Sequence, residues 1–357
     1  MKLREGASYM VRSIIFIGLA CTLTYAQSTD SNTSYIDETH MGISNKVLEW
    51  SDNIDTTISG WLCKNENNNT IACVEKRESS VKNTSLTVDA FFQSHKYFNE
   101  TDNTFIRLRT DSIFQTRESH DFNLRLSIQM PFSKSKQNLK IFFDDLDLDN
   151  TENVIRNDKD DKVVSDIGIH YFSPNNYGIQ SRYSLGISGV SPFVRARYSI
   201  PVKVGGWDID PIQIFKYSID DEFEEETNIY FDKAFEDLSL FRLQLHRKTQ
   251  TKVDGMDYAL GMEYYWSIRK KTGLKVSQSF FGNTKYPYVA DKSIEPPEIE
   301  TYGGINNYVT SISWRENIWR KWFYYEVTPI VSFHKDHDFK ANYAIRIFFD
   351  FYIGQYN

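Results

Sequence analysis

Residues 338–353, DFKANYAIRIFFDFYI, decide the fold of this chain. From Tyr343 to Ile353 every second residue is apolar, and the residues between them include the charged Arg346 and Asp350. A period of two is typical of a β-strand whose two faces meet different environments. The segment therefore predicts a strand with one apolar, aromatic-rich face and one face that carries charge.

The chain begins with a segment typical of exported proteins. In residues 1–26, the basic Lys2, Arg4 and Arg12 precede and flank an apolar run at 14–23, and the segment ends on small residues. This order predicts a secretory signal peptide. The run is too short for a membrane-spanning helix, which needs about 20 residues.

The alternation seen at 338–353 recurs along most of the chain after residue 104, for example at 122–130, 241–246, 258–264 and 323–333. Several of these segments reach the length of about 9–11 residues that a tilted spanning strand needs. Alternating strands in an exported chain predict an all-β fold, a closed antiparallel transmembrane β-barrel with lipid outside and a polar lumen. The aromatic content of 15% fits the interfacial girdles of such barrels.

We predict about fourteen strands, with twelve as the alternative if the weaker pair around 189–221 merges. The two longest connections, 148–162 and 284–305, then fall at the same end of the barrel, where external loops are long. The predicted strands are 104–115, 120–132, 137–147, 163–173, 177–188, 192–204, 208–220, 224–235, 237–249, 256–269, 272–283, 306–316, 322–334 and 338–353.

The chain divides into a signal peptide (1–26), a prelude (27–100) and a barrel (101–357). In the prelude, Val88–Phe98 is expected to form a short helix. The prelude is expected either to cap the barrel on the periplasmic side or to fold back and plug it. The sequence leaves both arrangements open, and the cap is the commoner one.

A second helix is expected at 43–62, because apolar residues recur there at spacings of three and four. Cys63 and Cys73 follow it, and an even number of cysteines in an exported chain predicts one disulfide. The apolar face of the expected helix comprises Val47, Trp50, Ile54, Ile58 and Leu62.

The charged face of the strands is where function is expected. Arg or Lys facing the bilayer midplane costs about 2–4 kcal/mol, so these side chains must face the lumen. Unpaired arginines would attract small anions and set selectivity. Paired with carboxylates, they would crosslink and narrow the interior. The expected lumen-facing residues are Arg107, Arg109, Asp111, Arg125, Arg182, Arg195, Arg197, Glu226, Arg242, Glu263, Arg315, Glu326, Arg346 and Asp350.

No catalytic or cofactor motif is found in the sequence: it has no GxSxG, HExxH, Walker or GxGxxG pattern. We therefore expect no enzyme activity, no cofactor and no metal site, and we expect the acidic run at 220–226 to be a solvated turn. Removing residues 1–26 takes three basic residues and one acidic residue away, so the net charge changes from −7 to −9. An acidic chain without a basic tract argues against a nucleic-acid partner.

The C-terminal region also carries a set of motifs that extends to the strand at 338–353. It combines an Arg-Asn-Ile core, a Tyr-Glu-x-x-Pro strand and a turn ending in Asp-Phe-Lys. These positions are Arg315, Asn317, Ile318, Tyr325, Glu326, Pro329, Asp338, Phe339 and Lys340. With 191–207 and 231–237, they resemble a family of uncharacterised proteobacterial outer-membrane proteins. The likeness covers most of 88–353, and the cysteine loop departs from it. It implies an outer-membrane barrel and no established activity, so no functional residue is carried over.

The leading hypothesis is a passive porin-like channel in the outer membrane of a Gram-negative cell. Its expected partners are outer-membrane lipid, lipopolysaccharide and small anionic solutes. The alternative is a sealed structural or assembly barrel that presents surface loops or binds periplasmic proteins. A weaker alternative is an outer-membrane hydrolase that uses His170 or His246.

Overall fold

The computed structural model describes most of the barrel and parts of the prelude. The described residues are 35–62, 88, 91–92, 103–132, 139–143, 166–174, 177–235, 238–269, 271–291 and 298–355. The predicted signal peptide, the predicted disulfide between Cys63 and Cys73 and the predicted loop 148–162 lie outside these residues. The chain divides into two units after Gly42, and the second unit, Ile43–Asn357, contains the barrel.

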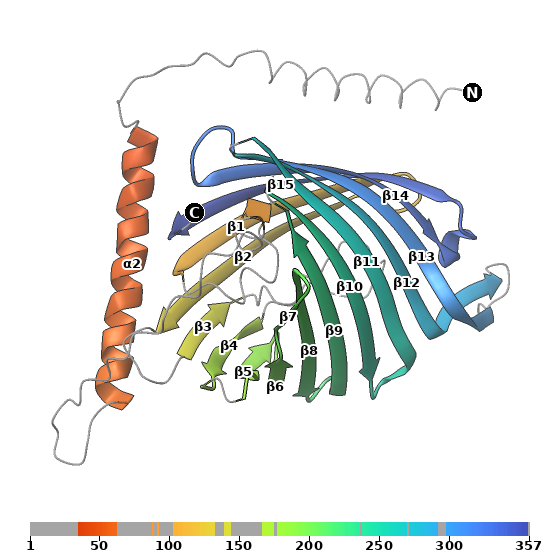
Figure 1. The fold of residues 1–357 in the computed structure, drawn as a ribbon, viewed down its shortest axis with the longest axis horizontal. Helices are drawn as coiled ribbons and strands as arrows, with labels where there is room; N and C mark the ends of the chain where they lie inside the picture. Colours follow the sequence, from red (N-terminus) through yellow and green to blue (C-terminus); the bar gives the residue numbers. More distant parts are fainter. Residues whose placement is uncertain are drawn as a thin grey trace. The chain divides into compact units, whose positions relative to one another are not determined.

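The strands form one antiparallel sheet that closes on itself (Figure 1). Strand β1 pairs with β15, and β6 pairs with β8, so that the ring has no free edge. In chain order the strands are β1 (Phe105–Gln115), β2 (Asp121–Phe132), β3 (Leu139–Phe143), β4 (Asp166–Phe172), β5 (Gln180–Ser188), β6 (Ser191–Ser199), β7 (Val202–Val204), β8 (Trp207–Ser218), β9 (Glu222–Ala234), β10 (Ser239–Gln250), β11 (Val253–Arg269), β12 (Thr272–Asp291), β13 (Glu298–Glu316), β14 (Phe323–His334) and β15 (Ala341–Gly354).

We call each complete strand of the ring a stave, and β6 and β7 together form one stave. Both pair with β8 in a continuous register, since Ser199 faces Ile212 and Val202 faces Ile209. The break falls at Pro201, which has no N–H to donate to the ladder. The barrel therefore has fourteen staves, as predicted, and the twelve-strand alternative is wrong.

One predicted connection, 284–305, is wrong, because most of it is strand. Strand β12 continues to Asp291 and β13 begins at Glu298. Beyond Asn283 and Asn307 these two strands pair only with each other, so they extend past the rim as a hairpin. Aromatic and β-branched residues in this stretch favour strand despite its turn-like composition.

The two ends of the barrel differ. We call the end where β1 begins and β15 finishes the terminal end, and the opposite end the distal end. The β12–β13 hairpin extends from the distal end. At that same end, the 3₁₀ turn η2 (Lys335–His337) connects β14 to β15.

The two faces of the wall are as different as the alternation predicts. On β15, Tyr343 is 60% exposed on the outer face, while Asn342, Arg346 and Asp350 are buried on the inner face. Large apolar side chains are exposed around the ring, among them Leu124, Leu185, Ile312 and Phe349. An apolar outer belt around a polar interior is the surface of a transmembrane barrel.

Helix α2 (Tyr35–Leu62) begins earlier than predicted, and its packing corrects the sequence analysis. Trp50, expected on the packed face, is 65% exposed. The buried side is a largely polar stripe that includes Val47 of the predicted apolar face, which is 5% exposed. Ser51 Oγ lies 3.0 Å from Thr104 Oγ1, and Ser44 Oγ accepts a 3.2 Å hydrogen bond from the Gly354 backbone N–H. The described helices include none that is both long and apolar enough to cross a membrane.

Candidate functional site: the inner wall of the barrel

Four strands contribute to a buried ion-pair cluster at the terminal end. Arg109 donates from Nε and Nη2 to the two carboxylate oxygens of Asp350, at 2.6 and 2.9 Å. Arg315 Nη2 donates to Asp350 at 2.9 Å, and Arg315 Nη1 donates to Glu326 at 3.3 Å. Arg315 is 0% exposed and Asp350 is 1% exposed. The cluster therefore joins β1, β13, β14 and β15 through charge-assisted bonds out of contact with solvent.

Register explains why these partners meet. Arg109 lies directly opposite Asp350 where β1 pairs with β15, and Arg315 lies opposite Glu326 where β13 pairs with β14. Opposite charges in facing positions are favourable cross-strand pairs. In this part of the wall the arginines are therefore paired with carboxylates, which is the alternative in which charged residues crosslink the interior.

Two further pairs extend this pattern around the ring. Arg346 on β15 donates from Nε to Asp111 on β1 at 2.7 Å. Arg242 on β10 donates to both oxygens of Asp232 on β9 at 2.7 and 2.9 Å. Asp232 has the inward parity of Glu226 on the same strand, as its place in the alternating pattern predicts.

The remaining predicted carboxylates also have partners on the inner wall. Glu263 accepts a 2.7 Å hydrogen bond from the Tyr265 hydroxyl and lies 3.8 Å from Lys275 Nζ. Glu226 accepts a 2.6 Å bond from the Asn228 amide. These acids lie on β9 and β11, and with Asp210 on β8 they place most carboxylates of the described inner wall on the side from β8 to β1.

The opposite side of the ring carries a set of basic residues that we call the basic arc. It spans β2 to β6, where the described inner-face positions carry two carboxylates, the exposed Asp121 and the buried Asp166. Arg182 and Arg195 are 4% exposed, whereas Arg125 and Arg197 are half-buried. The basic arc comprises Arg125, Lys140, Arg182, Arg195 and Arg197.

Members of the basic arc are placed together by register and held over aromatic rings. Arg182 faces Arg197 across the β5–β6 ladder. The Arg195 guanidinium lies 5.5 Å from the centroid of the Phe193 ring, and the Lys140 ammonium lies 5.6 Å from that of Phe172. Cation–π contacts of this kind stabilise a cation at its position.

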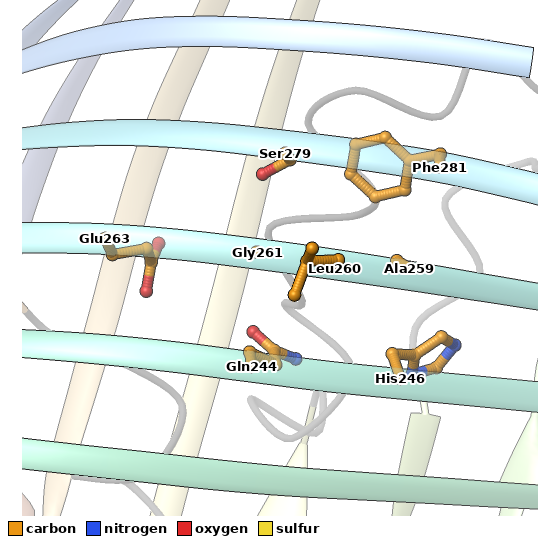
Figure 2. Close-up of a pocket in the computed structure, with 8 residues that line it drawn as sticks. All are labelled: Gln244, His246, Ala259, Leu260, Gly261, Glu263, Ser279 and Phe281. Atoms are coloured by element: carbon orange, nitrogen blue, oxygen red, sulfur yellow. The ribbon is translucent and has the colours of Figure 1, made fainter. Parts of the chain in front are cut away.

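A small recess lies in the inner wall where β10, β11 and β12 run side by side. Figure 2 shows Gln244 and His246 along one side of it and Ser279 along the other, with Gly261 between them. His246 Nδ1 lies 2.8 Å from Asn228 Oδ1. Hydrogen-bonding groups therefore line this part of the pore.

Of the two histidines named in the hydrolase alternative, His170 is enclosed in the wall. His170 Nδ1 lies 2.8 Å from Ser184 Oγ, a pairing that the sequence analysis missed. The His170 ring stacks on Phe142 at 4.1 Å between centroids, and both members of the pair are buried. The Ser184 hydroxyl is therefore enclosed by the wall, at 5% exposure of its residue. No group of three or more His, Cys, Asp or Glu that could hold a metal ion occurs in the described part of the chain.

No family model matches the chain, and no curated protein is similar to it in sequence. Solved structures that resemble it include an anion-selective porin from Comamonas acidovorans, at 8% identity and a TM-score of 0.43, covering 70% of this chain and 98% of the porin. OmpT of Vibrio cholerae gives 9% identity and a TM-score of 0.41, covering 70% and 97% of the two chains. OpdK of Pseudomonas aeruginosa, solved with vanillate, gives 8% and 0.41, covering 70% and 98%. These likenesses are too distant to carry an argument, so function must be argued from the inner wall.

Proposed function

We propose that this protein is a porin-like channel of the outer membrane that favours small anionic solutes. One observation carries the proposal: a closed barrel with an apolar outer belt has a basic arc along one side of its inner wall. Rings and arcs of arginine and lysine are the usual means by which a pore selects anions.

The distribution of charge inside the barrel supports anion preference. From β9 to β1, carboxylates such as Asp232, Asp111 and Asp350 neutralise neighbouring arginines. From β2 to β6 the described inner face carries more basic than acidic side chains. A low-dielectric wall concentrates the field of such an excess on the space that it encloses.

The number of staves supports a pore rather than a solid core. Barrels of about 8 strands fill their interior with side chains, whereas those of about 16–18 leave an aqueous channel. A barrel of fourteen staves is closer in size to the barrels that leave an aqueous channel. The proposed location follows from the apolar outer belt and the predicted signal peptide, with outer-membrane lipid and lipopolysaccharide as neighbours.

The sealed structural barrel remains the second candidate. The observation that favours it is the terminal ion-pair cluster, in which Arg109, Arg315 and Asp350 join β1, β13 and β15 within one part of the wall. Such crosslinks would suit a barrel whose role is mechanical.

Swelling of proteoliposomes separates the two candidates. The refolded mature protein is reconstituted into vesicles, which are diluted into a small organic anion or a cation of matched size. We expect swelling in both solutes, and faster swelling in the anion. Equal rates would contradict anion preference, and the absence of swelling with folded protein would favour the sealed barrel.

A further inference from the structure

Three residues of the prelude lie against the inner wall at the terminal end. Val88 and Phe92 pack with Leu240 of β10 and Tyr265 of β11 in one buried cluster. The rings of Phe92 and Tyr265 meet edge to face at 5.0 Å. Leu240 is 0% exposed, so the prelude covers it completely. This packing explains why Leu240, an apolar residue, occupies an inward-facing position of a polar wall.

Phe91 extends the contact to the next strands. Its ring lies 6.2 Å from that of Tyr324 on β14, beside a second buried cluster that includes Phe105 and Tyr352. Its backbone carbonyl accepts a 2.9 Å hydrogen bond from Nε of Arg315, the arginine that also binds Asp350. The terminal ion-pair cluster thus holds the prelude as well as the wall.

The wall is shaped to receive these rings at Gly273 on β12. A Cβ at this position would lie 2.6 Å from the Phe92 ring and 2.7 Å from the Phe91 ring. Real Cβ atoms essentially never approach so closely, so any other residue would displace both rings. Both the aromatic residues of the prelude and the glycine of the wall therefore determine where the prelude docks.

We propose that Val88, Phe91 and Phe92 form a plug that narrows the terminal mouth of the pore and directs solutes along the basic arc. The inference rests on the proposed channel function. The plug contacts β10 to β14, and the basic arc lies on β2 to β6, halfway around a ring of fourteen staves. A solute that enters the terminal end on the side away from the plug therefore meets the basic arc.

A glycine pair tests the plug from the wall side, without altering the plug itself. Gly273→Ala should displace the rings and raise single-channel conductance by about twofold or more, since conductance follows the cross-section at the narrowest point. Gly261→Ala is the matched control: it also adds a methyl to the inner wall, but its Cβ would lie 3.7 Å from the nearest atom. Equal conductance in wild type, Gly273→Ala and the control would overturn the plug and leave the channel intact.

A second measurement keeps the plug testable if no variant conducts, an outcome that would itself contradict the channel. Val88→Cys, in a chain with Cys63→Ser and Cys73→Ser, is treated with a water-soluble maleimide. A docked plug predicts slow labelling, because Val88 is 3% exposed, and labelling about tenfold faster when Gly273→Ala is added. Fast labelling in both backgrounds would show that the plug is not docked and would overturn the inference.

Discussion

At the scale of single residues, Asp350 is a buried carboxylate that pairs with two arginines. It lies between Arg109 and Arg315, at 2.6 and 2.9 Å. Asp350→Asn keeps the shape of the side chain but leaves two buried guanidiniums with less compensating charge. We expect the free energy of unfolding to fall by about 3–5 kcal/mol, measured by urea denaturation in lipid vesicles.

The control for this change is Asp338→Asn, which removes the same charge from a pair that is open to solvent. Asp338 lies 3.4 Å from Lys340 at the distal end, and both side chains are largely exposed. Exposed pairs contribute little to stability, so this variant should unfold close to the wild type. Equal losses in the two variants would show that burial of the cluster is unimportant.

Residues of the basic arc should govern selectivity rather than stability. Replacing Arg182 and Arg195 by Gln removes two positive charges from the inner wall, so the preference for anions over cations should fall. The readout is the reversal potential in a salt gradient. Lys203→Gln is the control, since Lys203 is exposed at the terminal end, and it should leave the potential unchanged. An unchanged potential in the double variant would exclude the arc as the selective element.

At the scale of elements, alternation predicted the strands well because period two reports directly on two unlike faces. It predicted the buried side of β15, including Arg346 and Asp350. Helix α2 shows the limit: periodicity finds an amphipathic helix but does not say which side is covered. Its polar side packs through Ser44 and Ser51, and Trp50 stays exposed.

A pair of glycines allows close packing between four neighbouring strands, β3 to β6. Gly168 of β4 faces Gly186 of β5, and a Cβ on either would lie within 2.8 Å of the ring of Phe142 or Phe193. Gly168→Val should therefore lower the free energy of unfolding by about 1–3 kcal/mol, through overpacking, as measured by urea denaturation. Gly261→Ala, which has room for its methyl, should cost far less. A harmless Gly168→Val would mean that the Phe142 ring and the facing backbone of β5 can move aside freely.

At the scale of the whole molecule, the site emerges only when the barrel closes. Arg109 and Asp350 are 241 positions apart, and the pairing of β1 with β15 places them face to face. Parity in the sequence selected both residues for the lumen, but pairing depends on register, which parity does not give. For the same reason the sequence does not show which lumen-facing arginines belong to the basic arc and which are ion-paired. It also does not show whether Phe91 and Phe92 dock on the wall.

The central claim, that the barrel is an open pore that favours anions, is tested most directly in a planar bilayer. The refolded mature protein is inserted, and single-channel current is recorded across a salt gradient. The account predicts steady conductance and a reversal potential shifted toward that of the anion. A silent bilayer, with folding verified by heat-modifiable gel migration, or a potential shifted toward the cation would contradict it.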